Sequence, residues 1–194
     1  MAQRWLLVTT STAGESSTLR VWAWRRLRSL GAHYLQQSVC LLPATPKTTR
    51  AVNRVLARLG EEGGHGQALS ISIDAVQEGK VIEAFQAERT DEYGEVVERT
   101  KEFHAELAME RGRGRATYTE LEESEVDLSR HKRWLASIEA RDYFDAPGHE
   151  EAVAAVAACE QALADFEAEA IKSEMQSGQA KGDEKERAFR VVEG

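Results

Sequence analysis

The sequence lacks the features that mark several common protein classes. It has two cysteines, Cys40 and Cys159, too few for the disulfide framework of a small secreted domain. Its longest uninterrupted apolar run, residues 152–159, is mostly alanine and far shorter than a membrane-spanning helix. The apolar run after Arg4 ends at Val8, so the start of the chain does not predict a signal peptide. We therefore expect a cytoplasmic protein without membrane contact.

The motifs of common enzyme classes are also missing. There is no Walker A run, no GxSxG and no HExxH, and the glycines after Leu59 follow a predicted helix rather than a strand. The five histidines are scattered without the spacing of a zinc site. His131 and Cys159 could approach each other between helices, but two ligands are too few for a metal site. We expect no catalytic residue, no metal and no cofactor.

Acidic residues are nearly absent from the first part of the chain. Residues 1–60 contain nine basic residues and a single acid, Glu15, whereas residues 61–194 contain 16 basic and 32 acidic residues. The net charge of −8 therefore averages a segment at +8 with one at −16. Such an asymmetry indicates binding of a polyanion by the basic part. With 42% hydrophobic residues, the 194-residue chain can form a packed core.

Residues 1–77 alternate between strand and helix patterns. Strand-forming runs cover residues 5–10 and 34–42, the second with a kink or tight hairpin at 36–38, and alternation at 69–73 predicts a further strand. Two helices with one apolar stripe each are predicted up to Leu30 and from Pro46 to Leu59. The fold class is therefore α+β, with a ferredoxin-like βαββαβ order and both helices on one face of a mainly antiparallel sheet.

Residues 78–176 have the pattern of an acidic helical extension of about three helices. Gly94 lies inside the first predicted helix and is a candidate interruption. The second carries leucines at 121, 128 and 135 followed by Ile138, a seam that packs against another helix and offers a surface for a homodimer. The last helix, 149–175, has an apolar stripe of Val153, Val156, Leu163, Phe166 and Ala170. Residues 177–194 are polar and predict a mobile tail.

Five ordered blocks of the sequence resemble a known family. They are LRVWAWRRLRSLGA (19–32), LQQSVCLLP (35–43), YTELEE (118–123), RWL (133–135) and RDYFDAP (141–147). Together they resemble the N-terminal domain of the chromate-resistance regulator ChrB, over about residues 4–175. The first half is also distantly similar to the central domain of the PaaX repressors, which is ferredoxin-like.

The resemblance implies a cytoplasmic, DNA-binding transcriptional regulator. Its implied partner is the operator of a chromate-resistance operon, and chromate is an implied effector. Longer family members carry a further C-terminal domain, whereas this sequence has 194 residues.

The basic residues of the two predicted helices in residues 1–60 are the candidates for contact with DNA phosphates. They recur at helical spacing on the sides opposite the apolar stripes, and an antiparallel sheet would bring both helices onto one surface. The candidate DNA-binding residues are Arg20, Trp24, Arg25, Arg28, Lys47, Arg50, Arg54 and Arg58. The alternative is that these arginines pair with the acidic helical half of the chain.

A second group of cations belongs to the predicted leucine-seam helix and its end. Arg130, Lys132, Arg133 and Arg141 are candidate contacts for an oxyanion such as chromate, because such an anion requires cationic donors. Solvated surface charges are the alternative interpretation. At the level of function, the alternative to a DNA-binding regulator is a non-enzymatic protein-interaction or oxyanion-sensing module.

Overall fold

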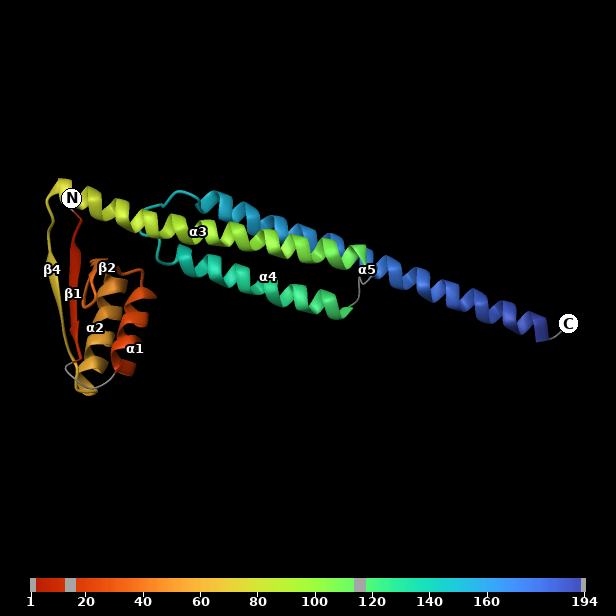
Figure 1. Cartoon of the computed structure of the whole chain (residues 1–194), viewed down its shortest axis with the longest axis horizontal. Coiled ribbons are helices and arrows are strands. Elements are labelled where there is room, and N and C mark those ends of the chain that lie inside the picture. Colours follow the sequence, from red (N-terminus) through yellow and green to blue (C-terminus); the bar gives the residue numbers. More distant parts are fainter. Residues whose placement is uncertain (1–2, 13–16, 114–117, 193–194) are drawn as a thin grey trace. The chain divides into compact units, whose positions relative to one another are not determined.

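The computed structural model describes residues 3–12, 17–113 and 118–192, and its N-terminal part follows the predicted alternation (Figure 1). The strands are β1 (Trp5–Ser11), β2 (His33–Gln36), β3 (Val39–Pro43) and β4 (His65–Ile71). The helices between them are α1 (Ser17–Arg28) and α2 (Pro46–Glu61). The predicted kink within residues 34–42 is the tight connection between β2 and β3. Pro46 begins α2 as predicted, after a capping box between Thr45 and Thr48.

The four strands form an antiparallel sheet in the order β2-β3-β1-β4. This is the order of a ferredoxin-like βαββαβ unit, so the predicted fold class is confirmed. β1 pairs with β3 on one side and with β4 on the other, and Leu7 lies opposite both Leu41 and Leu69. The pairing of β2 with β3 has a register shift between Tyr34 and Gln36, which marks a bulge at that edge. β4 forms the other edge without a shift.

Both faces of the sheet are packed. On one face α1 and α2 cover a core of eleven buried residues from the sheet and the two helices, which includes Val8, Leu27 and Leu59. On the other face Trp5 and Leu41 pack against Phe85 of the following helix. The Trp5 indole stacks obliquely on Phe85 and Phe144, with ring centroids 5.6 Å apart in both pairs, and donates a hydrogen bond to Glu78 Oε1 at 3.0 Å.

The chain divides into two compact units at positions that differ from the predicted segment boundaries. The first unit comprises residues 1–90 and 138–147, and the second comprises residues 91–137 and 148–194. Helix α3 (Ala75–Gly112) contributes to both, because its first turns carry Phe85 and cover the sheet. The 138–147 segment joins the first unit through Tyr143, whose hydroxyl donates to the Leu30 carbonyl at 2.6 Å.

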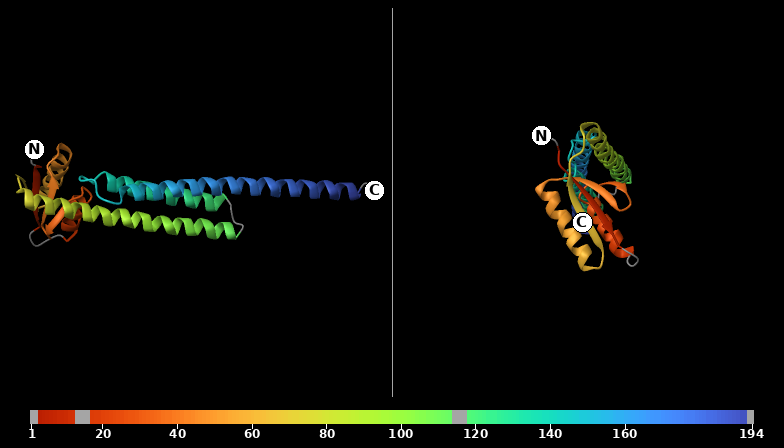
Figure 2. Two further views of the ribbon diagram at one scale, coloured as in Figure 1. Left: turned by 90° about the horizontal axis from the view of Figure 1, so that it is seen from above. Right: turned by 90° about the vertical axis from the view of Figure 1, so that its left-hand side faces the viewer.

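The second unit contains the rest of α3 with α4 (Tyr118–Glu139) and α5 (His149–Val192), which run side by side (Figure 2). Gly94 does not interrupt α3, which is continuous through it. Along α5 the predicted stripe is buried except at Val153, which is 40% exposed. The backbone of the predicted tail is helical up to Val192, and residues 193–194 lie outside the described part of the chain. Its mobility stays a prediction.

The leucine seam of α4 is used within the chain. Leu121, Leu128, Leu135 and Ile138 are each at most 8% exposed. A second copy therefore cannot use this seam without unpacking the unit, and the predicted dimer surface is wrong at this place. Among the described residues, no helix has both the length and the apolar character needed to cross a membrane.

Candidate functional site

The predicted DNA-contact residues all lie at the surface of the first unit. The exposed side chains are Arg20, Trp24, Arg25 and Arg28 on α1 and Lys47, Arg50, Arg54 and Arg58 on α2. The opposite side of each helix supplies the core that holds it on the sheet, through Leu19, Ala23 and Leu27 of α1 and Val52, Val55 and Leu59 of α2. Apolar spacing therefore determines which way the cations point, as expected for amphipathic helices.

A cation–π contact fixes which flank of α2 faces α1. The Arg58 guanidinium lies over the Trp22 ring at 4.2 Å from its centroid. Lys47, Arg50, Arg54 and Arg58 recur at helical spacing, so the cationic stripe of α2 extends from the side towards α1, at Arg58, to the outward face of the helix, at Arg50. Arg58 also pairs with Glu62, with Nε and Oε1 2.6 Å apart.

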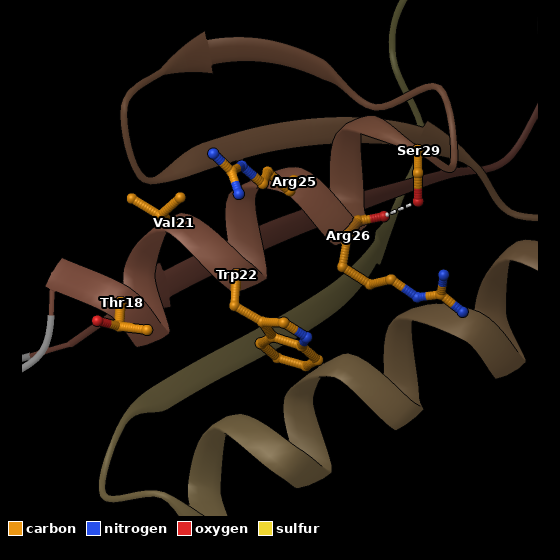
Figure 3. A pocket seen from close by; sticks show the side chains of 6 residues that line it. All are labelled: Thr18, Val21, Trp22, Arg25, Arg26 and Ser29. Carbon is orange, nitrogen blue, oxygen red and sulfur yellow. Dashed lines mark hydrogen bonds between the residues drawn. The ribbon is translucent and has the colours of Figure 1, made fainter.

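A shallow cavity of about 650 Å³ lies along the part of α1 that flanks this stripe. Its lining residues are Thr18, Val21, Trp22, Arg25, Arg26 and Ser29. Trp22 and Arg26 point towards α2, and Arg25 points to the opposite side (Figure 3). The cavity thus combines two guanidinium groups and two hydroxyls with an aromatic ring, a set that suits phosphate oxygens and an adjoining flat group.

Arg26 was missed by the sequence analysis. The signal for it is its position four residues after Trp22, which places both side chains on one face of α1. Lys47 lies near the other end of the α2 stripe, where its Nζ is 3.5 Å from the Ala140 carbonyl. We call the set Trp22, Arg25, Arg26, Lys47, Arg50, Arg54 and Arg58 the α1–α2 basic surface.

The stripe of Arg20, Trp24 and Arg28 does not join this surface. Arg28 lies over the Trp24 ring at 5.3 Å, and its charge acts on Tyr34 of β2 and on Glu88 of α3. Burial raises the pKa of Tyr34, and the nearby Arg28 opposes that rise. These neighbours place the stripe on the β2 side of α1, away from α2. The expectation that all eight residues share one surface is therefore wrong, because α1 separates the two stripes.

The cations of the α1–α2 basic surface differ in how far they are neutralised. Within the described ranges, Arg25, Arg26, Arg50 and Arg54 have no carboxylate within salt-bridge distance. The sequence explains this, because residues 16–60 contain no Asp or Glu. Guanidinium groups held close together without acids repel one another, and an anion bound between them relieves that repulsion.

The candidate oxyanion contacts are distributed and largely neutralised. Arg130 pairs with Asp127 and Lys132 with Glu160, while Arg133 Nε donates to the Ser129 carbonyl at 3.1 Å. Arg141 lies beyond the end of α4 and in the other compact unit, packed against Gly31. A cavity of about 390 Å³ reaches Arg130, but its lining includes Glu102, Glu106 and Asp127. Those carboxylates disfavour an oxyanion there.

The sequence suggested that His131 could approach Cys159, but the histidine beside Cys159 in the structure is His104. Cys159 Sγ lies 3.6 Å from His104 Nε2, whereas His131 packs edge-on against Phe103. Burial raises the pKa of the Cys159 thiol to about 11, which keeps it protonated and unreactive. In the part of the chain that the structure describes, no group of three His, Cys, Asp or Glu side chains is placed to hold a metal ion.

Comparison with known proteins agrees with the resemblance noted in the sequence. The family model described as Protein ChrB, N-terminal, matches residues 20–177. The chain is also similar to Protein ChrB of Cupriavidus metallidurans (strain CH34), with 28% identity over 142 residues. That match covers 72% of this chain but 40% of the relative, so this chain corresponds to less than half of that protein. No solved structure matches the chain significantly.

Proposed function

The chain belongs to the ChrB N-terminal family, and from this premise we propose that it is a cytoplasmic, non-enzymatic transcriptional regulator of the chromate-resistance type. On this proposal it binds operator DNA through the α1–α2 basic surface. Chromate, or a signal derived from it, would modulate that binding. The family relation supports the regulatory role, and the charge distribution of α1 and α2 supports the choice of DNA as partner.

The observation that carries the DNA proposal is the set of four exposed arginines on α1 and α2 for which the described residues supply no carboxylate partner. Arg26 of α1 points towards α2, on the side where Arg58 lies over Trp22, and Arg25 borders the same cavity from the opposite side of α1, while Arg50 and Arg54 belong to the cationic stripe of α2. Guanidinium groups bind phosphate oxygens in a bidentate manner, and several of them spread over two helices suit the successive phosphates of a nucleic-acid backbone better than a single small anion. Each phosphate contact would release counterions.

The α1–α2 basic surface contacts the DNA backbone and would set the position of the protein on the duplex. Phosphate contacts carry little sequence information, so base reading requires additional groups. Trp24, with Arg20 and Arg28 on the other side of α1, is exposed and available for such a base contact. The set that we expect to dominate affinity is the six cations of the α1–α2 basic surface.

The test is a titration of duplex DNA from the chain's own promoter region at several salt concentrations. Six neutralised phosphates predict a slope of log affinity against log salt of about −5. The double variant Arg50→Glu with Arg54→Glu should lower the affinity about 100-fold at low salt, because it removes two phosphate contacts and adds repulsion. A thermal melt verifies that the exposed substitutions leave the fold intact.

The matched control is Arg130→Glu with Lys132→Glu, which changes the net charge by the same amount on α4. Both residues are exposed and paired with acids, so this variant should keep the wild-type slope. An equal loss in both double variants would mean that net charge and not this surface binds DNA. Wild-type chain that fails to bind duplex DNA at low salt would overturn the proposal.

The same variants distinguish DNA binding from the alternative function, a protein-interaction module. The second compact unit carries a formal charge of −10, against +2 for the first, so a basic partner would bind the second unit. Arg50→Glu with Arg54→Glu would leave such a complex intact. Repeating the DNA titration with chromate, and with sulfate as a control for ionic strength and shape, tests chromate as effector.

A further inference from the structure

The two edges of the sheet differ in how well they are protected. β2 is four residues long and its pairing is broken by a bulge, both of which hinder the addition of another strand. β4 is seven residues long, pairs with β1 in unbroken register and contains neither proline nor Lys, Arg, Asp or Glu. No described strand pairs with its outer side (Figure 1). An edge of this kind is a template for strand addition.

The flank of α2 beside this edge is also uncharged. Leu56 lies over β4, because a Cβ on Gly66 would meet Leu56 Cδ2 at 2.5 Å. The side of α2 that Leu56 shares therefore faces the edge, opposite the flank on which Arg58 contacts Trp22. This flank consists of Thr49, Asn53, Leu56 and Gly60, none of them ionisable, with Asn53 exposed.

An uncharged edge beside an uncharged helix flank suits self-association. In a two-fold symmetric interface the same surface of both copies is in contact. A charged flank would therefore lie against the same charge of the second copy. None of the four cations of α2 lies on this flank: Arg58 faces α1, and the others spread from that cationic flank to the outward face of the helix, where Arg50 lies. A partner selected by charge would approach that cationic flank instead. Leu69 of β4, 44% exposed, adds apolar area at the edge.

We propose that two copies of this chain associate through antiparallel pairing of their β4 strands, with the Thr49–Asn53–Leu56 flanks of the two α2 helices adjacent. The paired strands join the two sheets into one continuous sheet. Because the two-fold axis is perpendicular to the joined sheet, α1 and α2 of both copies lie on the same face. On the proposed function, this presents two α1–α2 basic surfaces to one side, as a palindromic operator requires.

The test measures the mass of the full chain without DNA, by sedimentation equilibrium over a micromolar concentration range. The wild type should be a dimer. Asn53→Glu should raise the dissociation constant about tenfold or more, because like charges then face each other across the axis. Asn53→Lys should do the same, and an equimolar mixture of the two variants should restore dimers. Ala136→Glu, at an exposed site on α4, is the matched control and should leave the dimer unchanged.

A second substitution examines the strand itself. Leu69→Lys places a charge on the exposed edge, and it should give monomers with an unchanged circular dichroism spectrum. If the wild-type chain is monomeric at every concentration, the proposal is overturned. The edge would then be free to pair with a strand of another protein. A dimer that keeps its affinity in both Asn53→Glu and Leu69→Lys would also overturn the proposal. Because no DNA is present, these outcomes are independent of the DNA titration.

Discussion

Basic side chains in the two compact units have different surroundings. In the second unit many of them pair with carboxylates: Arg99 with Glu102 at 2.7 Å, Lys101 with Glu98 at 2.6 Å, Arg111 with Glu169 at 2.9 Å and Arg113 with Glu110 at 2.8 Å. On α1 and α2, among the described residues, Arg58 has such a partner in Glu62, and Arg25, Arg26, Arg50 and Arg54 do not.

The difference has a local cause. Acids occur three residues away from many cations of the helical unit, where a helix brings the two side chains together. Residues 16–60 contain no acid, so the cations of α1 and α2 other than Arg58 have no acid within four residues along the helix. Counting charges over the whole chain gives −8 and hides this. We therefore expect an anion to bind at the cations of α1 and α2 that have no acidic neighbour, and not at the paired cations of the second unit.

The variants that should lose the most stability test whether the two units are packed separately. Trp5→Ala in the first unit and Phe166→Ala in the second remove side chains that are 0% exposed, and each should cost about 3–5 kcal/mol of stability. Each unit also holds one buried cysteine. Burial raises the pKa of Cys40 to about 12 and that of Cys159 to about 11, so neither thiol reacts readily in the folded chain.

Thiol labelling in native buffer therefore reports which unit opens. Trp5→Ala should accelerate labelling of Cys40 and Phe166→Ala that of Cys159, as read by mass spectrometry of the labelled peptides. The wild type, with both thiols protected, is the control. Equal acceleration of both thiols by either variant would contradict separate packing and indicate one cooperative unit.

A smaller expected change, in the salt dependence of DNA binding, distinguishes the two sides of α1. Arg25→Ala with Arg26→Ala removes two cations of the α1–α2 basic surface and should reduce the magnitude of the DNA salt slope by about 2. Arg20→Ala with Arg28→Ala removes the same charge from the β2 side and should change the slope less. Fluorescence anisotropy across salt concentrations measures both. A larger change from the second pair would move the binding surface to the β2 side of α1.

A third prediction concerns acid stability of the first unit. Burial alone would raise the pKa of Glu88, but a hydrogen bond and the charge of His33, with Arg89 and Arg28 nearby, lower it below its ordinary value of 4.5. Its stabilising contribution is therefore complete above about pH 4.5 and is lost as the pH falls through the lowered value. Glu88→Gln should destabilise the chain near neutral pH and flatten the acid side of the stability curve.

Chemical denaturation at a series of pH values measures this effect. Glu102→Gln, whose partner Arg99 is exposed, is the control in the helical unit and should leave the curve nearly unchanged. An unaltered acid transition in Glu88→Gln would mean that the contact with His33 contributes nothing to stability.

Removing a paired cation of α4 should change stability and DNA binding least of all. Lys132→Ala should cost at most about 1 kcal/mol, because exposed ion pairs contribute little to stability. It should also leave the DNA salt slope unchanged, in contrast to Arg50→Ala, which should reduce its magnitude by about 1. Denaturant unfolding and the DNA titration measure the two quantities. Loss of DNA affinity in Lys132→Ala would remove the distinction between paired and unpaired cations.

Local sequence patterns were sufficient for much of the N-terminal fold. The alternation at 69–73, the apolar stripe through Val52, Val55 and Leu59, and Pro46 at the first turn of α2 each reflect a rule that acts within a few residues. They predicted the four strands, the two helices and the ferredoxin-like order, although β4 begins at His65 and ends at Ile71 and so only partly overlaps the predicted 69–73. Exposure of the eight candidate residues followed from the same rule, because the side of a helix opposite its apolar stripe faces water.

Patterns that depend on distant partners were interpreted less well. The seam at Leu121, Leu128 and Leu135 has the spacing of a helix interface, but spacing does not say whether the partner is the same chain or another. Gly94 carries a propensity cost of about 1 kcal/mol, and the packing of Tyr93 and Val96 beside it outweighs that cost in α3. Arg141 appeared to extend the α4 cations, although the chain leaves the helix before it.

Local patterns in the sequence were enough to predict the order of strands and helices between residues 5 and 71, the exposed cationic sides of α1 and α2, and the lack of acids near all of those cations except Arg58. These features depend on helical and strand periodicity and on neighbours a few residues away. The packed structure was needed to show that Arg58 stacks on Trp22, that Arg20, Trp24 and Arg28 lie on the other side of α1, and that α3 contributes to two units. Those features depend on how helices are rotated against a sheet and against each other. That rotation is set by the packing of side chains far apart in the sequence, which no local pattern records.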